Sequence, residues 1–149
     1  MMAELKTVDS IGTYDLPVFV KPDSELVVAE AESHLPISIQ RVFAIRAEKG
    51  TMRGNHAHRQ CTQVLVCLHG KVAVRCDDGD SSRTVELDRP SRALLIPPSI
   101  WAEQTYLESP TLLMVLCDRP FEEEDYIRDR AEFEKYRTMK SQLSDAGVK

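Results

Sequence analysis

The sequence has no surplus of basic residues, and this limits the partners it can have. Its 149 residues include 19 lysines and arginines against 24 aspartates and glutamates, which gives a formal net charge of −5 at pH 7. A nucleic-acid-binding domain needs a basic surface, so we expect no nucleic-acid partner. A small anionic ligand is still compatible with this charge, because a local group of arginines can hold it.

Cysteines at metal-binding spacing are also absent. The chain has Cys61, Cys67, Cys76 and Cys117, and no two of them form a C-x-x-C pair. Cys61 and Cys67 lie in or beside an apolar segment, where cysteine behaves as a small apolar side chain. We therefore expect buried thiols rather than disulfides.

The sequence also shows no targeting segment and no membrane span. The N-terminus shows neither the apolar stretch nor the cleavage site of a signal peptide. No apolar run approaches the roughly 20 residues that cross a bilayer. We expect a cytoplasmic protein with no membrane partner. Since there is no repeat, linker or low-complexity segment, we expect one domain over residues 1–149.

Short strands separated by turn residues fill the middle of the chain. Apolar or alternating stretches predict strands at residues 36–45, 53–58, 63–68, 71–76, 82–87, 93–96, 100–106 and 111–117. Residues 77–80 read Asp-Asp-Gly-Asp and predict a hairpin turn, because Asp and Gly tolerate a positive φ. Many short strands at regular spacing indicate an all-β sandwich or barrel, with its core at residues 36–118.

The two ends of the chain differ from this middle part. Residues 1–35 predict only short strands, at 7–8, 18–20 and 26–28. After Phe121 the apolar residues recur at helical spacing, and residues 122–125 are four acids of the kind that the N-terminus of a helix favours. We therefore expect a C-terminal helix over residues 121–142.

The stretch around which the chain is organised reads Arg-Gly-Asn-His-Ala-His at residues 53–58. Residues two apart on a strand share a face, so His56 and His58 are expected to lie side by side. Gly54 stands where the backbone has to bend or approach another strand closely. The pattern predicts two imidazoles on one surface.

This stretch resembles the first motif of the cupin superfamily. Gln63 follows His58 by five positions, and Gly70 follows Gln63 by seven. The resemblance implies an all-β fold, a cupin (jelly-roll) antiparallel β-barrel with a C-terminal helix, and a site inside the barrel.

The resemblance does not extend to the metal ligands of that superfamily. Metal-binding cupins add a Glu and a third His, and this chain has Gln63 and Ala102 at those positions. Two imidazoles and a neutral amide make a poor site for a divalent ion. We therefore expect no metal and no cofactor. The imidazoles are free for acid–base chemistry, since imidazole titrates near pH 6.5.

Further blocks resemble the cupin-type sugar 3,4-ketoisomerases of the FdtA and WxcM-like group. They are Arg-Val-Phe at 41–43, the histidine stretch, Gln-Val-Leu-Val-Cys at 63–67, Asp-Asp-Gly at 77–79, Trp101 and Asp-Tyr-Ile-Arg at 125–128. The resemblance covers residues 34–136. It implies a homodimer that moves the carbonyl of dTDP-4-keto-6-deoxyglucose from C4 to C3 without metal or nicotinamide. His56 and His58 would be its catalytic acid and base, working through an enediol.

Five further residues are candidates for binding this substrate. Arg53 adjoins the histidines, Arg46 shares strand parity with Ala44, and Arg41 lies on the same predicted strand. Arginine binds diphosphates well because it forms bidentate hydrogen bonds. Gln63 either contacts the sugar, orients a histidine or is a buried amide. Trp101 either stacks on a base or sugar or packs the end of the barrel.

The chain departs from this family at two positions. Members commonly carry a Tyr where this chain has Ala44 and a His where it has Ala102. The changes either adjust a pocket wall or mark a relative with another sugar or stereochemical outcome.

Three alternatives remain open. A 3- or 3,5-epimerase would pair its base His with an Asp, and no such pair is visible in the sequence. A non-catalytic sugar-nucleotide-binding cupin is compatible with Ala44 and Ala102. A metal-dependent dioxygenase is disfavoured by Gln63 and Ala102.

Overall fold

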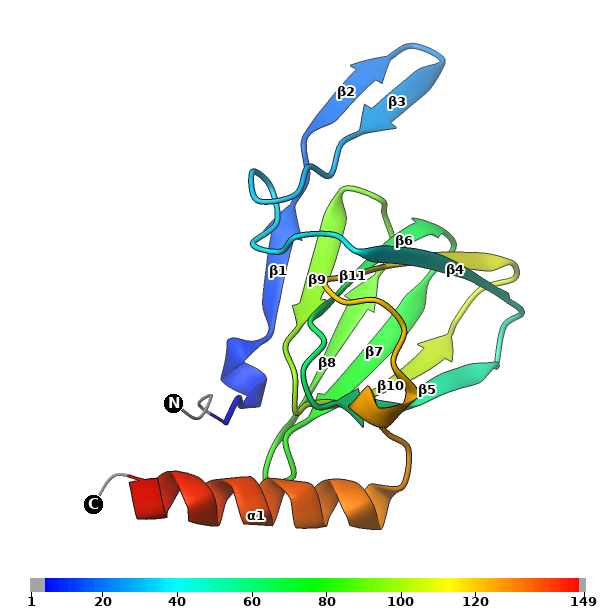
Figure 1. Cartoon of the computed structure of the whole chain (residues 1–149). Helices are drawn as coiled ribbons and strands as arrows, with labels where there is room; N and C mark the ends of the chain where they lie inside the picture. Colours follow the sequence, from blue (N-terminus) through cyan, green and yellow to red (C-terminus); the bar gives the residue numbers. More distant parts are fainter. Residues whose placement is uncertain (1–4, 148–149) are drawn as a thin grey trace.

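Two five-stranded antiparallel sheets face each other in the computed structural model, which describes residues 5–147. The first sheet has the strand order β1-β9-β6-β11-β4, and the second β12-β5-β10-β7-β8 (Figure 1). One C-terminal helix, α1, runs across the end of the second sheet. The prediction of an antiparallel jelly roll with a C-terminal helix is confirmed, with two facing sheets in place of a closed barrel.

The elements have the following bounds. The first sheet contains β1 (Gly12–Asp15), β9 (Arg92–Ile96), β6 (Gln63–His69), β11 (Thr111–Cys117) and β4 (Arg41–Ala47). The second contains β12 (Tyr126–Ile127), β5 (Met52–His58), β10 (Trp101–Tyr106), β7 (Val72–Asp77) and β8 (Ser82–Leu87). A separate hairpin contains β2 (Val18–Lys21) and β3 (Ser24–Val27), and the helices are η1 (Val8–Ser10), η2 (Glu123–Asp125) and α1 (Arg130–Gly147).

The hydrophobic core follows from the apolar patterning of the strands. β6 is buried on both faces, as its continuous apolar run predicts. Side chains such as Leu65, Val74 and Leu113 pack between the sheets, while Val64 and Val66 face the other side of the first sheet. Residues 35–39 cross that outer side, where Leu35 and Ile37 cover part of it. The Asp-Asp-Gly turn joins β7 to β8, as predicted.

The N-terminal strands were predicted only in part. Residues 7–8 are not a strand, since η1 begins at Val8, and β1 was not predicted. The stretches at 18–20 and 26–28 do form strands, and they pair as the β2–β3 hairpin. This hairpin extends away from the two sheets (Figure 1).

The C-terminal helix begins later than predicted. It starts at Arg130, not at residue 121, and continues to Gly147 instead of ending at residue 142. The acids before it form η2, and Tyr126 and Ile127 then pair with His58 and Ala57 of β5. The reason is tertiary, because strand pairing with β5 replaces the helical hydrogen bonds that the local pattern favours. The helix docks through Phe133, which is fully buried.

Within residues 5–147, no helix has the length and hydrophobicity that a bilayer span requires.

Candidate active site

β5 brings His56 and His58 together inside the second sheet, as the sequence predicts. Their ring centroids are 5.0 Å apart and the ring planes are nearly perpendicular, at 86°. His58 is buried, with 7% of its surface exposed, whereas His56 is only partly buried. The two imidazoles therefore have different surroundings although they share a strand face.

A backbone irregularity just before His56 sets its orientation. Gly54 and Asn55 both have positive φ, 88° and 54°, and β10 shifts register opposite them. A Cβ on Gly54 would lie 2.9 Å from the carbonyl oxygen of Ala102, so only glycine fits this close approach. His56 then turns back so that its Nδ1 lies 3.0 Å from the carbonyl oxygen of Gly54.

The proton on His56 can be placed from this contact. A carbonyl oxygen only accepts hydrogen bonds, so Nδ1 of His56 is the donor and Nε2 is a free acceptor. Burial, assisted by the neighbouring His58, lowers the pKa of His56 to about 4. The ring is therefore neutral at pH 7, with its basic nitrogen available.

Asp125 holds His58 from the other side. Nδ1 of His58 donates to the Asp125 carboxylate across 2.8 Å, in a buried contact. The same carboxylate accepts from the backbone N–H groups of Gln60 at 2.6 Å and Cys61 at 3.3 Å. Burial lowers the pKa of His58, and the hydrogen bond to Asp125 opposes that shift.

The second ring nitrogen of His58 has no such partner. Nε2 is buried and makes no hydrogen bond to any residue in the range 5–147. With Nδ1 donating to Asp125, Nε2 is the acceptor nitrogen of the ring. A buried acceptor beside a cavity is the position where an atom of a ligand is expected to arrive.

A cavity of about 380 Å³ opens beside the two rings. It is lined by Arg41, Phe43, Ala44, Ile45, Arg53, Gly54, His56, Gln63, Gln104, Phe121, Tyr126 and Arg128. His58 packs against two of these lining side chains, His56 and Tyr126, with ring centroids 5.0 and 4.3 Å away. The cavity combines three guanidinium groups with imidazole, phenol and amide groups.

The structure brings together most of the predicted site residues. Arg41, Arg53 and Gln63 line the cavity with His56. The side-chain nitrogen of Gln63 donates to the sulfur of Cys117 on β11 across 3.6 Å, so part of its hydrogen-bonding capacity is used within the first sheet.

Two predicted substrate-binding residues lie outside the lining. Arg46 is mostly exposed and pairs with Glu48 at 3.7 Å. Trp101 packs against Phe133 under α1, and its indole nitrogen donates to Glu103. Trp101 therefore has the packing role, and neither residue enters the function proposed below.

Other residues of the site were missed from the sequence. Asp125 was interpreted as part of a helix start and a His-Asp pair as absent, and the structure contradicts both interpretations. Tyr126 and Arg128 also line the cavity. The Asp-Tyr-Ile-Arg block was the available signal. Its pairing with β5 could not be deduced from the sequence, because His58 and Asp125 are 67 positions apart and no local pattern indicates their contact.

The donor set does not fit a metal ion of the cupin type. Ala102 offers no ligand, and Gln63 donates toward Cys117. Among residues 5–147, one group of three potential ligands lies close together, His58, Cys61 and Asp125. There both carboxylate oxygens already accept hydrogen bonds from neighbouring N–H groups. In this group, Asp125 orients the His58 ring through a hydrogen bond. The expectation of a metal-free site stays a prediction.

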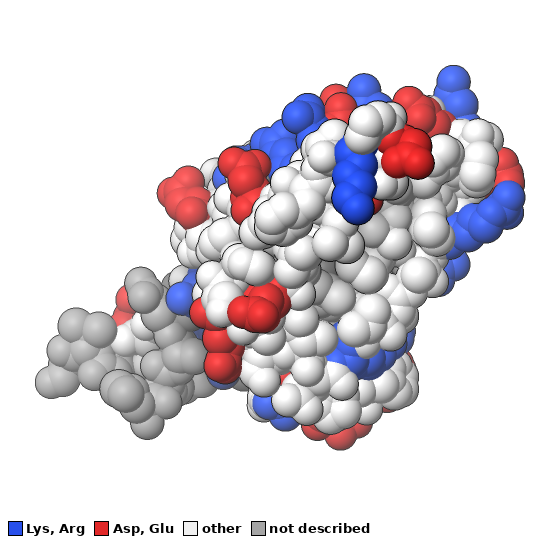
Figure 2. All heavy atoms as spheres, turned by 90° about the horizontal axis from the view of Figure 1, so that it is seen from above, with Lys and Arg blue, Asp and Glu red and all other residues white. Residues whose placement is uncertain are grey.

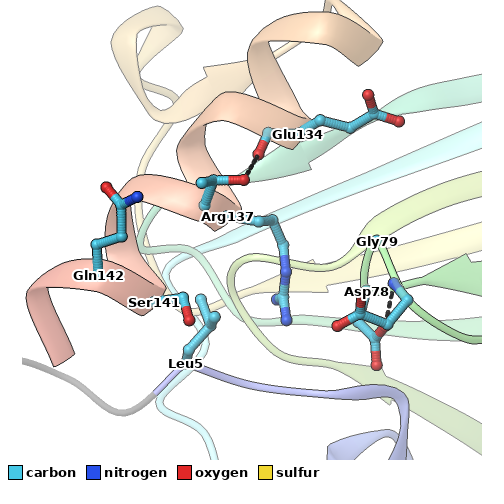
Figure 3. A pocket seen from close by; sticks show the side chains of 9 residues that line it. Leu5, Asp78, Gly79, Glu134, Arg137, Ser141 and Gln142 are labelled. Atoms are coloured by element: carbon cyan, nitrogen blue, oxygen red, sulfur yellow. Dashed lines mark hydrogen bonds between the residues drawn. The ribbon is translucent and has the colours of Figure 1, made fainter. Parts of the chain in front are cut away.

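A second cavity, of about 400 Å³, lies between α1 and the β7–β8 turn (Figure 3). Arg137 extends from α1 into it and donates to the carbonyl oxygens of Lys6 and Ser99. Asp78 accepts from three backbone N–H groups, including that of Val8. These charges attach the helix and the N-terminal segment to the sandwich, so we assign no site there.

An antiparallel jelly roll that carries a Gly-x-His-x-His strand beside a cavity defines a cupin domain. Similarity to known proteins then identifies the family within the cupin class. The chain belongs to the FdtA family, described as WxcM-like, C-terminal, whose sequence model matches residues 9–138.

Three relatives illustrate the family. The TDP-4-oxo-6-deoxy-alpha-D-glucose-3,4-oxoisomerase of Aneurinibacillus thermoaerophilus is 41% identical over 112 residues, which cover 74% of this chain and 81% of that protein. The sugar 3,4-ketoisomerase QdtA of Thermoanaerobacterium thermosaccharolyticum, solved in complex with TDP, is 28% identical with a TM-score of 0.85, over 89% of this chain and 97% of QdtA. A histidine-to-asparagine mutant of QdtA in complex with TDP-4-keto-6-deoxyglucose has a TM-score of 0.83 and 28% identity, over 87% and 94% of the two chains.

Proposed function

We propose that this protein is a 3,4-ketoisomerase of a TDP-linked 4-keto-6-deoxysugar, with TDP-4-keto-6-deoxyglucose as the substrate. One observation carries the proposal: two neutral imidazoles, one of them backed by Asp125, lie at a cavity lined by arginines. The names of the relatives at 41% and 28% identity support the same substrate class.

The reaction consists of proton transfers. A base removes the C3 proton, the C3–H electron pair becomes a C3=C4 double bond, and the C4 oxygen takes up a proton to give an enediol. The O3 proton then leaves, the C3 carbonyl forms, and C4 receives a proton. The sequence is redox-balanced within the sugar, so no external oxidant or reductant is required.

His58 is the base that acts at carbon in this proposal. A proton next to a ketone is weakly acidic, so its removal needs the more basic of the two imidazoles. Asp125 stabilises the imidazolium form of His58, whereas His56 has only a backbone carbonyl to support it. The unpartnered Nε2 of His58 is the accepting atom, and substrate binding must open the cavity toward it.

His56 and the arginines hold the substrate. The free Nε2 of His56 accepts a hydrogen bond from a sugar hydroxyl, because its Nδ1 is occupied by Gly54. Arg53 and Arg41 supply positive charge for the diphosphate, and the Gln63 amide contributes a polar group to the same wall. These assignments keep both histidines in contact with the reacting sugar.

The deciding experiment is incubation with TDP-4-keto-6-deoxyglucose in D₂O, followed by NMR of the sugar ring. A new 3-ketone, with deuterium at C4 where the imidazolium proton exchanges, is the expected result. The His58→Asn variant should abolish C3 exchange, and His56→Asn should retain slow exchange. His69→Asn, at the exposed end of β6, is the control. Exchange lost only in His56→Asn would reverse the two roles, and no 3-ketone from the wild type would reject the function.

A 3- or 3,5-epimerase is the second candidate, because the His58–Asp125 pair is the base that such an enzyme requires. It would return the proton to the same carbon. In the same NMR experiment, deuterium at C3 or C5 with the 4-ketone retained would support the epimerase function.

We also propose that the working unit is a homodimer. The β2–β3 hairpin exposes Phe19, Val20 and Leu26, with 62%, 73% and 61% of their surfaces accessible. A two-stranded hairpin of this size is marginally stable in water by itself. An apolar groove of about 340 Å³, lined by residues that include Val42, Val66 and Met114, lies on the outer face of the first sheet. A second copy would bury both, each hairpin in the groove of its partner.

A further inference from the structure

Two of the four cysteines lie against each other at the end of the first sheet. Cys117 is the last residue of β11 and is the register partner of Gln63 on β6. The ladder continues one residue further, since the Asp118 N–H donates to the Thr62 carbonyl oxygen across 3.2 Å. Cys61 lies two positions before Gln63, so both cysteine side chains face the core between the sheets. The two thiols are free and share a hydrogen bond.

This pair of thiols adjoins the candidate active site on two sides. Gln63 lines the cavity, and its amide donates to the sulfur of Cys117 across 3.6 Å. The backbone N–H of Cys61 donates to Asp125 across 3.3 Å. The sulfur of Cys61 lies within 4.8 Å of a ring nitrogen of His58 and a carboxylate oxygen of Asp125. A small molecule in the cavity is therefore one side chain away from Cys117, and a displacement of Cys61 reaches Asp125.

The surroundings of the pair make Cys117 the more reactive thiol. The thiolate, not the thiol, is the form that attacks an oxidant. A hydrogen bond from Cys61 lowers the pKa of Cys117 against the effect of burial, and the Gln63 amide adds a second donor. The pKa of Cys61 is raised, so it stays a thiol. Burial raises the pKa of Cys67 to about 11 and that of Cys76 to about 12, which leaves both unreactive.

We propose that Cys61 and Cys117 are a redox-active pair that a peroxide converts to a disulfide, and that this modification inactivates the neighbouring site. The Cys117 thiolate attacks one peroxide oxygen, the O–O bond breaks, and a sulfenic acid and a hydroxide form. The Cys61 sulfur then attacks the sulfenic sulfur, the S–S bond forms, and the S–O bond breaks with release of water. The two sulfurs lose two electrons and the peroxide gains two, so the step is balanced. A small dithiol reverses it.

The disulfide would change the site through the two contacts described above. Drawing the Cys61 sulfur onto Cys117 shifts the backbone N–H that binds Asp125, and the Gln63 amide loses a thiolate as its acceptor. A displacement of about 1 Å in a positioned group can cost 10²-fold in rate, so kcat should fall by roughly 10- to 10²-fold. The loss of activity rests on the proposed function, whereas disulfide formation does not.

The test treats the reduced full-length protein with hydrogen peroxide, blocks the remaining thiols by alkylation and maps the peptides by mass spectrometry. A peptide that links Cys61 to Cys117, lighter by two hydrogen atoms than the two reduced peptides, is the expected product, and dithiothreitol should remove it. Cys61→Ser and Cys117→Ser should each form no disulfide. Cys67→Ser is the matched control, because Cys67 is equally buried in the first sheet and should leave the disulfide unchanged.

Isomerase activity of the same samples gives the second readout. Peroxide should lower the kcat of the wild type and dithiothreitol should restore it, whereas Cys117→Ser, which lacks the nucleophile, should keep its own activity under peroxide. Alkylation of both Cys61 and Cys117 after peroxide treatment, or a disulfide that involves Cys67 or Cys76, would overturn the pair. A Cys61–Cys117 disulfide with unchanged kcat would overturn the inactivation. A wild type that forms the disulfide but never isomerises the sugar would instead reject the proposed function.

Discussion

Asp125 controls the protonation of His58, although the two residues are 67 positions apart in the chain. Its carboxylate fixes the ring proton on Nδ1 and leaves Nε2 as the acceptor. It also ties residues 60 and 61 to η2 through two backbone hydrogen bonds. One side chain thus orients His58, the proposed base, and holds the loop that follows β5.

Replacing Asp125 tests this double role. Asp125→Asn removes the charge that stabilises the imidazolium, so kcat should fall by roughly 10²- to 10³-fold. Stability should fall by about 1–3 kcal/mol, because buried N–H groups lose part of their partner. Asp118→Asn is the control, since Asp118 accepts from the nearby Thr62 N–H without touching His58. A variant with kcat within threefold of the wild type would remove Asp125 from the mechanism.

The lowered pKa of His56 makes stability depend on pH. The ordinary value is 6.5 and the folded value is about 4, so the unfolded chain binds more protons between these limits. Stability should therefore rise from pH 4 to pH 6.5 and be lost as the pH falls through this window. His58 acts in the same direction, since its pKa is also lowered.

Urea unfolding at a series of pH values measures this dependence. His56→Asn should reduce the slope of the midpoint against pH between 4 and 6.5, and His69→Asn at an exposed position should leave it unchanged. Equal slopes for the wild type and His56→Asn would show that His56 is not the group responsible.

At the level of elements, β5 depends on the glycine that precedes its histidines. Gly54→Ala forces a Cβ to within 2.9 Å of the Ala102 carbonyl oxygen, at a φ of 88°. We expect a loss of about 1–3 kcal/mol and a lower kcat, since the carbonyl that holds His56 must move.

Gly50→Ala is the matched control for this variant. Its φ is 92°, but nothing lies within 4 Å of the added Cβ, so it introduces strain without a clash. Denaturant midpoints and kcat of the two variants separate these effects. Equal losses would mean that the approach of β5 to β10 does not position His56.

The short strand β12 shows how tertiary contacts override a local pattern. The acids at 122–125 favour a helix start, yet Tyr126 and Ile127 pair with β5. Ile127 is fully buried beneath α1 with Phe133. Strand pairing and apolar burial together outweigh the local helical preference, which is small per residue.

At the scale of the whole molecule, the projecting β2–β3 hairpin exposes apolar side chains that a single chain does not bury. Figure 2 looks down on the end that carries the hairpin and shows a surface that is largely uncharged in its middle, with charges toward its margins. The apolar side chains of the hairpin and the apolar groove on the first sheet are complementary in chemistry. In the proposed homodimer, each hairpin would be buried in the apolar groove of the partner.

Phe19→Asp tests this arrangement. A charge on the hairpin should convert the dimer to a monomer at micromolar concentration, because it cannot be buried without a partner. Met139→Asp is the matched control, since this exposed apolar residue lies on α1, at the opposite end of the molecule. Sedimentation measures the mass of each form. A monomeric wild type, or a dimeric Phe19→Asp variant, would reject the hairpin-in-groove dimer.

The sequence by itself determined the strand pattern, an all-β sandwich or barrel, and the side-by-side histidines. Each of these follows from local rules: period-two alternation, turn residues, and the shared face of positions i and i+2. Gly54 also belongs here, because glycine before the histidines indicated the close approach that the structure contains.

Only the tertiary structure decided which groups surround those histidines. Asp125, Tyr126 and Arg128 reach the cavity because β12 pairs with β5, and that pairing depends on contacts between distant segments. For the same reason, the sequence could not show that Trp101 and Arg46 lie outside the cavity lining. Strand parity predicts which face of a sheet a side chain is on, but not which other segments pack against that face. The different partners of the two rings, a backbone carbonyl for His56 and the Asp125 carboxylate for His58, likewise exist only in the folded chain.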